Sequence, residues 1–330
     1  MTVTVYKSTD ASAPVLTGQA GKLIDLLDAV LVNGYGSKAA QGWSKVYSGT
    51  NKAAYRSNDS TSNRFYLRVD DGATITAGLG KEGAIRGFES MTDVDTGTGP
   101  FPTVAQWTNG MVWTKSTTAD ATARAWCLVG DGRTLYVRLV NGSQSLLGGF
   151  GHCNSFRPGD NFNSFIAGHA VNGAAAAQNT MGTAPTVNGI TQASQVYLPR
   201  PYHQLGGAIN IYPNMYPLYN NAANNVLILG AVTVAVTYGW LVTYPTTIDQ
   251  TMHFLPHGIF ENTSGTTWNF RALFPGMYVP LHSNPLTDLD TVPGGTLLPG
   301  RTLMGLTFNS NNAGGAPASQ FLVDTTGPWT

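Results

Sequence analysis

Charged residues are scarce in this sequence. Lys, Arg, Asp and Glu make up 11% of its 330 residues, against about 25% in ordinary soluble domains. Basic and acidic residues are equal at 18 each, which leaves no net charge. A neutral surface has little long-range field to attract nucleic acid or an anionic membrane. We therefore expect no nucleic-acid partner, and we expect protein neighbours instead, because low charge also weakens the repulsion between copies.

Long apolar runs are also lacking. The longest, residues 226–244, is interrupted by Gly and Thr, and its Val-Thr alternation is typical of strands rather than of a membrane helix. Residues 1–6 alternate like a strand and contain no basic segment of a secretion signal. We expect no membrane insertion, no signal peptide, and synthesis in a cytoplasm.

Cysteine and glutamate are rare. Cys127 and Cys153 provide no disulfide framework, so we expect reduced thiols in a core, with a single disulfide as the alternative. Glutamate occurs only at Glu82, Glu89 and Glu261, so a glycosidase-like carboxylate pair would have to come mainly from aspartates. The close aspartate pairs, such as Asp70-Asp71, stand near turn residues, where such side chains usually bind their own backbone.

The motifs of common enzyme classes are missing as well. The sequence contains no Gly-x-Ser-x-Gly, no P-loop, no dinucleotide fingerprint, no His-Glu-x-x-His and no Cys-x-x-Cys. We therefore predict that the protein is not an enzyme, with no catalytic residues and no cofactor.

Three groups of residues are candidates for holding a metal ion: His152, Cys153 and His169; His253 and His257; and Asp160, Asn161 and Asn163. The second group has the i, i+4 spacing of a helical site, but Pro256 argues against a helix there. The third group has fewer carboxylates than a calcium loop requires. We predict no metal site.

One segment has helical periodicity. Its apolar residues are Leu23, Leu26, Leu27, Val30 and Leu31, which fall on one face of a helix over about residues 18–33. Thr17 is a candidate N-cap, and Asn33-Gly34 is a typical helix end. This stripe must pack against something, either a neighbouring subunit or the chain's own strands around residues 65–69 and 135–139. We favour the chain's own strands.

Most of the other segments are predicted to be short strands. Residues 125–150 contain three β-rich runs separated by Gly130-Asp131-Gly132 and Asn141-Gly142, which predicts a meander. Residues 65–72 and 135–142 repeat one pattern, which suggests two similar hairpin units in one layer. The predicted fold class is mainly β, with antiparallel sheets in sandwich-like units and one amphipathic N-terminal helix.

The composition divides the chain into three parts. Residues 158–195 are rich in Ala, Asn and Gly and are predicted to connect a helix-plus-meander domain, residues 1–157, with a Pro/Tyr-rich β domain, residues 196–330. At the start of the latter, prolines alternate with tyrosines and prevent a central strand. The tyrosines there form a candidate contact surface: Tyr197, Tyr202, Tyr212, Tyr216 and Tyr219.

The 7 Trp and 14 Tyr residues allow a second interpretation. Aromatic faces with Asn, Asp and Gln side chains bind neutral sugars, although the same residues fill β cores and protein interfaces. A carbohydrate-binding module therefore stays open as an alternative.

The start of the chain resembles a group of virion structural proteins of tailed bacteriophages. The similarity lies in APVLTGQAG at residues 13–21, LLDA at 26–29 and LVNGYG at 31–36, and more weakly in QFLVD at 320–324 and TGPW at 326–329. It implies a component of the virion, in the tail, baseplate or neck, whose partners are copies of itself and other virion proteins. The alternatives are a receptor module that binds a host surface glycan and a capsid decoration protein. No catalytic residues come with this resemblance.

Overall fold

The computed structural model of the chain describes residues 2–72, 81–105, 108–141, 145–170, 195–199, 249–262, 268–280, 282, 286–308 and 319–329. Most of these residues lie in antiparallel strands, and one helical segment follows the first strand. The predicted mainly β class is therefore confirmed. Within these ranges, no helix has the length and hydropathy needed to cross a membrane.

Of the described strands, 12 form one antiparallel sheet. Its neighbours run in the order β1-β8-β9-β10-β12-β7-β5-β4-β3-β2, with β13 paired to β12 and β6 paired to β5. The bounds are β1 Thr4–Lys7, β2 Trp43–Gly49, β3 Lys52–Ser57, β4 Tyr66–Asp70, β5 Lys81–Asp93, β6 Thr96–Phe101, β7 Met111–Ser116, β8 Trp126–Gly130, β9 Thr134–Val140, β10 Ser145–His152, β12 Ser164–Ala170 and β13 Gln195–Tyr197.

A second sheet contains the other 6 described strands. Its order is β11-β15-β18-β17-β16, with β14 paired to β15. The bounds are β11 Asn154–Ser155, β14 Phe254–Asn262, β15 Trp268–Pro280, β16 Thr291–Pro293, β17 Thr302–Phe308 and β18 Ser319–Asp324.

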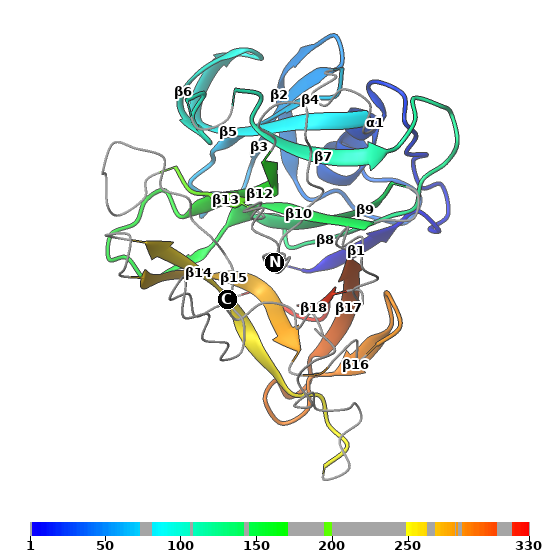
Figure 1. Cartoon of the computed structure of the whole chain (residues 1–330), viewed down its shortest axis with the longest axis vertical. Coiled ribbons are helices and arrows are strands. Elements are labelled where there is room, and N and C mark those ends of the chain that lie inside the picture. Colours follow the sequence, from blue (N-terminus) through cyan, green and yellow to red (C-terminus); the bar gives the residue numbers. More distant parts are fainter. Residues whose placement is uncertain are drawn as a thin grey trace, which may run out of the picture.

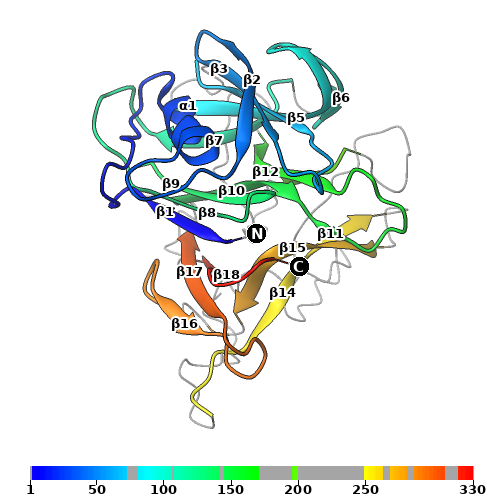
Figure 2. The ribbon, with the colours of Figure 1, turned by 180° about the vertical axis from the view of Figure 1, so that it is seen from behind.

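The two sheets build three tiers, because the first sheet folds over on itself (Figure 1). The upper tier contains β2, β3, β4, β5 and β7, the middle tier contains β1, β8, β9, β10 and β12, and the second sheet is the lower tier. The halves of the first sheet join where β12 pairs with β7, with His169 opposite Val112 and Ala170 opposite Met111. Figure 2 shows the same order of tiers from behind.

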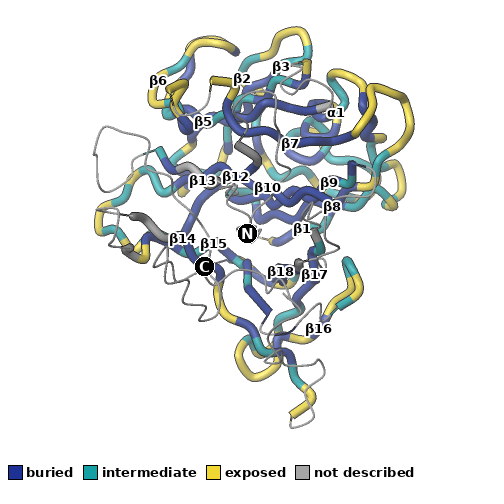
Figure 3. The backbone as a smooth tube through the Cα atoms, in the orientation of Figure 1, coloured by how far each residue is buried: buried dark blue, intermediate teal, exposed yellow. Residues whose placement is uncertain are grey.

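The middle tier has a hydrophobic core on each side. Successive side chains of a strand point to opposite faces. On β9, Leu135 and Val137 therefore pack in the core shared with the upper tier, and Tyr136 packs in the core shared with the lower tier. Every residue of β8 and β10 is buried, and these strands are dark blue in Figure 3. Burial on both faces explains why these strands have nearly continuous apolar sequences.

The predicted meander over residues 125–150 is confirmed as β8, β9 and β10. Gly130 pairs with Leu135 at the end of the first hairpin, and Gly132 adopts a φ of +87° in its turn. The two repeated stretches fall on β4, which lies between β5 and β3, and on β9, which lies between β8 and β10. They lie in the same sheet but in different tiers, on opposite sides of the helix.

The helical segment begins later than predicted. The α-helix α1 spans Lys22–Leu27 and continues as a π-helix, η1, over Asp28–Asn33, so the predicted start at residue 18 is wrong. The predicted end is confirmed, because the N–H of Gly34, whose φ is +75°, donates to the carbonyl of Ala29 at 2.8 Å. This bond spans five residues, as expected of a π-helical turn.

Thr17 is not the N-cap, which corrects the sequence prediction. Gly21 takes this position with a φ of +84°, and no side-chain cap hydrogen bond forms from it. Thr17 instead accepts a hydrogen bond at its Oγ1 from the N–H of Gln19 at 3.2 Å. The turn before the helix uses the hydroxyl, so the helix N-terminus needs another acceptor.

Part of the predicted connector is a strand. Residues 164–170 form β12, which pairs with β10 and β7 inside the first sheet, whereas residues 171–194 lie outside the described part of the chain. The core between the middle and lower tiers contains Tyr136 from the predicted first domain and Phe321 from the predicted last one. The two predicted domains therefore contribute to a common core.

Candidate functional site

The five residues of the predicted helical stripe lie in the chain's own core. Each is 0% exposed: Leu23, Leu26, Leu27, Val30 and Leu31. They share this core with Leu67 and Val69 of β4 and with Leu135, Val137 and Leu139 of β9. These strands belong to the two stretches favoured as partners in the sequence analysis. The helix therefore packs between the upper and middle tiers of a single copy (Figures 1 and 2).

Asp71 holds the N-terminus of this helix. It follows β4 directly, and its Oδ2 accepts a hydrogen bond from the N–H of Leu23 at 2.8 Å. Its main-chain carbonyl accepts a second hydrogen bond from the N–H of Gly21 at 3.4 Å. A carboxylate at this position satisfies N–H groups that lack helical partners.

Lys115 of β7 completes this buried site. Its Nζ pairs with Asp71 Oδ1 and donates to the carbonyl of Gln19 at 2.6 Å. The side chains of Lys115 and Asp71 are 1% and 0% exposed. Burial raises the pKa of Asp71 and lowers the pKa of Lys115, whereas their mutual attraction opposes both shifts. The side chains of Asp71 and Lys115 contact Leu23, Gln19 and each other, which belong to the helix N-terminus and the two strands, so we interpret the pair as a structural contact.

The candidate tyrosine surface falls mostly outside the described residues. Tyr197 lies in β13, where its backbone pairs with Ile166 of β12. Tyr202, Tyr212, Tyr216 and Tyr219 belong to residues 200–248, which the structure does not describe. That surface stays a prediction.

The first metal candidate, His152 with Cys153, has protein partners. His152 Nε2 accepts a hydrogen bond from the N–H of Asn63 at 3.0 Å and lies 3.0 Å from Ser62 Oγ, whereas Cys153 Sγ donates to the carbonyl of Asn163 at 3.2 Å. Burial, and next the guanidinium of Arg133, lower the pKa of His152 to about 4. Cys127 and Cys153 are both free and buried.

The pair of Ser62 and His152 resembles an activated nucleophile in composition, since an imidazole beside a hydroxyl can act as its base. The N–H of Asn63 occupies the same ring nitrogen. Ser62 and His152 are only 8% and 6% exposed. Their contact joins the loop between β3 and β4 to β10, so it connects the upper and middle tiers.

The other metal candidates are also separated or engaged. Asp160 accepts from Arg271 Nη2 at 2.5 Å and from Ser155 Oγ at 2.7 Å, so its carboxylate is already neutralised. His253 Nε2 lies 3.0 Å from Asp249 Oδ2, whereas His257 is fully buried. Within the described ranges, no group of three His, Cys, Asp or Glu side chains is arranged to hold a metal ion.

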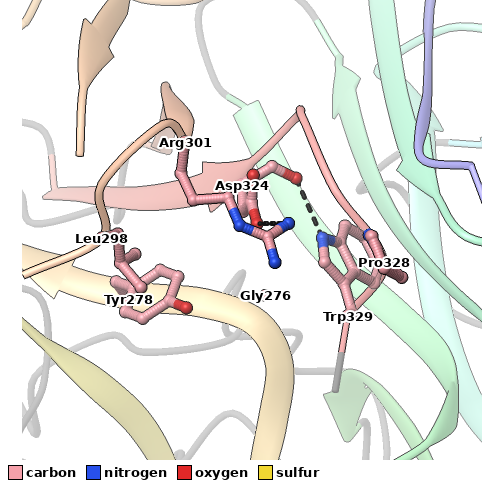
Figure 4. Close-up of a pocket in the computed structure, with 7 residues that line it drawn as sticks. All are labelled: Gly276, Tyr278, Leu298, Arg301, Asp324, Pro328 and Trp329. Atoms are coloured by element: carbon pink, nitrogen blue, oxygen red, sulfur yellow. Dashed lines mark hydrogen bonds and ion pairs between the residues drawn. The ribbon is translucent and has the colours of Figure 1, made fainter.

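A pocket of about 80 Å³ lies beside the end of the chain (Figure 4). Its lining residues are Gly276, Tyr278, Leu298, Arg301, Asp324, Pro328 and Trp329. Arg301 Nη1 contacts Asp324 Oδ2 at 3.1 Å, and Trp329 Nε1 donates to the carbonyl of Asp324 at 2.9 Å. Typical ligand pockets have volumes of about 300 to 1,000 Å³. The polar groups here bind one another, and the site anchors residues 325–329 rather than a ligand.

An exposed aromatic pair is the feature that sequence reasoning missed. Phe156 and Phe270 stack with ring centroids 4.9 Å apart and an interplanar angle of 28°, although they are 53% and 42% exposed. Beneath them, the N–H of Phe156 donates to the carbonyl of Arg271 at 3.0 Å. The only sequence signal was a phenylalanine in a loop-like stretch, Ser155-Phe156-Arg157-Pro158-Gly159.

No protein-family model matches this chain, and no curated protein matches it either.

Proposed function

We propose that this chain is a non-enzymatic structural component of a tailed bacteriophage particle, in the tail, baseplate or neck, that acts through contacts with copies of itself and with other virion proteins. The resemblance of residues 13–36 and the 11% content of charged residues support this proposal. The structural observation that carries it is the exposed pair of Phe156 and Phe270.

The aromatic pair is exposed and is held at a fixed position on the surface. Arg271, 4% exposed, pairs with Asp160 directly under the loop that carries Phe156. Breaking a buried ion pair by removing one partner is strongly destabilising, so this pair is expected to keep the loop in place. Aromatic side chains are enriched at interface cores and often dominate binding energy. Because the rings are already ordered, little further entropy would be lost when a partner covers them.

Side-chain contacts suit this chain better than strand addition. In the described part of the chain, the strands that pair on one side only are β1, β2, β6, β11, β13, β14 and β16. Of these, β1, β11 and β13 are 4, 2 and 3 residues long, and the pairing of β6 with β5 has a register shift. β2 has a register shift between Lys45 and Tyr47, β14 contains Pro256, and β16 is three residues long and ends at Pro293. Bulges, prolines and short length all discourage pairing with another edge. Subunits would then meet through surfaces such as the aromatic pair.

A double variant, Phe156→Ser with Phe270→Ser, tests the proposal. We expect it to keep the wild-type melting temperature but to lose self-association in sedimentation velocity and incorporation into phage particles. Leu297→Ser is the matched control, because Leu297 is also an exposed apolar residue, at 58%, and lies between β16 and β17 rather than in the aromatic pair. A double variant that enters particles at the wild-type level would contradict the proposed contact.

A glycan-binding receptor module is the second candidate, because exposed aromatic rings also bind sugars. Against it, the two rings cover one face of each other, and the carboxylate of Asp160 is engaged by Arg271. Glycan-array binding that disappears in the double variant would favour this candidate. Imaging of labelled particles would separate a tail location from a capsid decoration protein.

A further inference from the structure

One histidine lies in the core of the lower tier without polar partners. His257, on β14, is 0% exposed. Its ring stacks on Phe274 of β15, with centroids 4.9 Å apart and an angle of 19°, and lies 4.6 Å from the ring of Phe321 of β18. Neither Nδ1 nor Nε2 has a hydrogen-bond partner among the described residues.

This environment tolerates only the neutral imidazole. A buried polar group without a hydrogen bond is already costly, and a buried charge without a partner costs far more. Burial alone accordingly lowers the pKa of His257 to about 3 in the folded chain, against about 6.5 in an unfolded one. A protonated ring would have to leave the two phenylalanines to reach water.

Among the described residues, the nearest ionisable groups do not compensate for that charge. The hydrophobic cluster that contains Phe274 and Phe321 also contains Cys127, Cys153 and Tyr136. Burial raises the pKa of each of these three groups, so they are neutral near pH 7.

The charged groups on the strands packed against His257 are paired elsewhere. On β15, Arg271 binds Asp160, and on β18, Asp324 binds Arg301. Tyr278 of β15 packs in a separate cluster with Phe254. In the part of the chain that the structure describes, the carboxylates of Asp160 and Asp324 are thus engaged by arginines and are not paired with His257.

The ladder of the strand that carries His257 is interrupted at this point. β14 pairs only with β15 in the described part of the chain. Its register shifts between Pro256 and Gly258, and again between Ile259 and Phe260. Pro256, next to the histidine, has no N–H to donate. His257 itself has no register partner, because the pairing passes from Pro256 opposite Tyr278 to Gly258 opposite Leu273. The histidine therefore lies where the ladder is already broken.

We propose that His257 is a pH switch. Its protonation in mild acid moves β14 away from Phe274 and Phe321 and opens the lower tier. Between about pH 6.5 and pH 3, the open state takes up a proton that the closed state does not. The ratio of open to closed chains then rises about tenfold for each pH unit lost, from this one group. The inference holds whether or not the protein belongs to a phage particle.

Hydrogen exchange at a fixed pH tests whether protonation of His257 opens the lower tier. At pH 5, we expect amides of β14 and β15 to exchange at least tenfold faster in the wild type than in His257→Phe, whereas β3 and β4 exchange alike in both. At pH 7.5 the ratio of the two exchange rates should be about thirtyfold smaller than at pH 5, because His257 is neutral in both the open and the closed state there. His253→Phe is the matched control, since the His253 side chain is 42% exposed on the same segment, and it should behave as the wild type. Equal pH dependence in the wild type and His257→Phe would overturn the proposal.

A direct titration covers the case in which phenylalanine does not fit. His257→Leu then replaces His257→Phe in the exchange experiment. In the wild type, NMR of the imidazole carbons should show His257 neutral in the closed state down to at least pH 5. A native-state titration near pH 6.5, without faster exchange of β14, would equally overturn the proposal.

Discussion

The carboxylate of Asp71 accepts a hydrogen bond from the N–H of Leu23, 48 residues earlier in the chain. The contact places a negative charge from the end of β4 at the N-terminus of α1, where the helix dipole favours it. Because Asp71 also pairs with Lys115 of β7, one side chain joins the helix to two strands. The helical segment is thus held in the core of this chain by contacts to β4 and β7.

Asp71→Asn tests the contribution of the buried pair of Asp71 and Lys115 to stability. The substitution keeps an oxygen acceptor for Leu23 but leaves the buried ammonium of Lys115 without its counter-charge, and breaking such a pair typically costs about 3 to 5 kcal/mol. We expect a loss of this size in the free energy of unfolding, measured by urea titration. Asp70→Asn, on the neighbouring residue in a more exposed ion-pair network, should cost about 1 kcal/mol or less. Equal stability of the two variants would show that the buried pair does not act as described.

Leu27→Ala tests the helical stripe. Leu27 is 0% exposed in the core between the upper and middle tiers, and such truncations cost about 2 to 5 kcal/mol. Asp25→Ala is the control on the same helix, because the Asp25 side chain is 55% exposed and its pair with Lys22 contributes little. Thermal unfolding of the purified chain measures both. A Leu27 variant that melts like the wild type would mean that the stripe is stabilised by another subunit.

Gly276→Ala tests the anchoring of the chain end. Gly276 has a φ of +64°, and a Cβ there would overlap the indole of Trp329. Gly295→Ala isolates the backbone cost, since Gly295 has a φ of +59° and open space around its Cβ position. We expect the first variant to be less stable than the second by about 1 to 3 kcal/mol, the usual cost of overpacking, with a red shift of tryptophan fluorescence. Similar losses of stability in Gly276→Ala and Gly295→Ala would show that the contact with Trp329 adds nothing to the backbone cost.

Protonation of His152 is expected to cause a further loss of stability in acid. Its pKa in the folded chain, about 4, lies below the unfolded value of about 6.5. Its neutral form therefore stabilises the fold above pH 6.5, and this contribution of about 3 kcal/mol disappears as the pH falls to 4. His152→Gln keeps an acceptor for Asn63 and removes the titration. Urea unfolding across this range should show a smaller decline in the free energy of unfolding for the variant than for the wild type. The contribution of His257 to the decline is the same in both proteins, so it does not affect the comparison. Parallel pH curves would exclude this role.

Much of the architecture follows from local sequence signals. The spacing of Leu23, Leu27 and Leu31 predicts an amphipathic helix, and the turn residues at 130–132 predict the first hairpin of the meander. Both signals depend on neighbours within one or two turns of chain. The N-cap prediction at Thr17 failed because the acceptor for the helix is Asp71, which the chain brings back from a distant strand.

The sequence by itself determined the mainly β class, the helical stripe with its end at Gly34, and the scarcity of charge, because periodicity and composition are local or summed properties. Only the tertiary structure decided which polar residues are buried together. Asp71 resembled an ordinary turn residue, Phe156 a loop residue and His257 a metal candidate. Their roles depend on Leu23, Phe270 and Phe274, which are distant in sequence or belong to a neighbouring strand. Burial and pairing are properties of the packed tiers, so no local pattern in the chain encodes them.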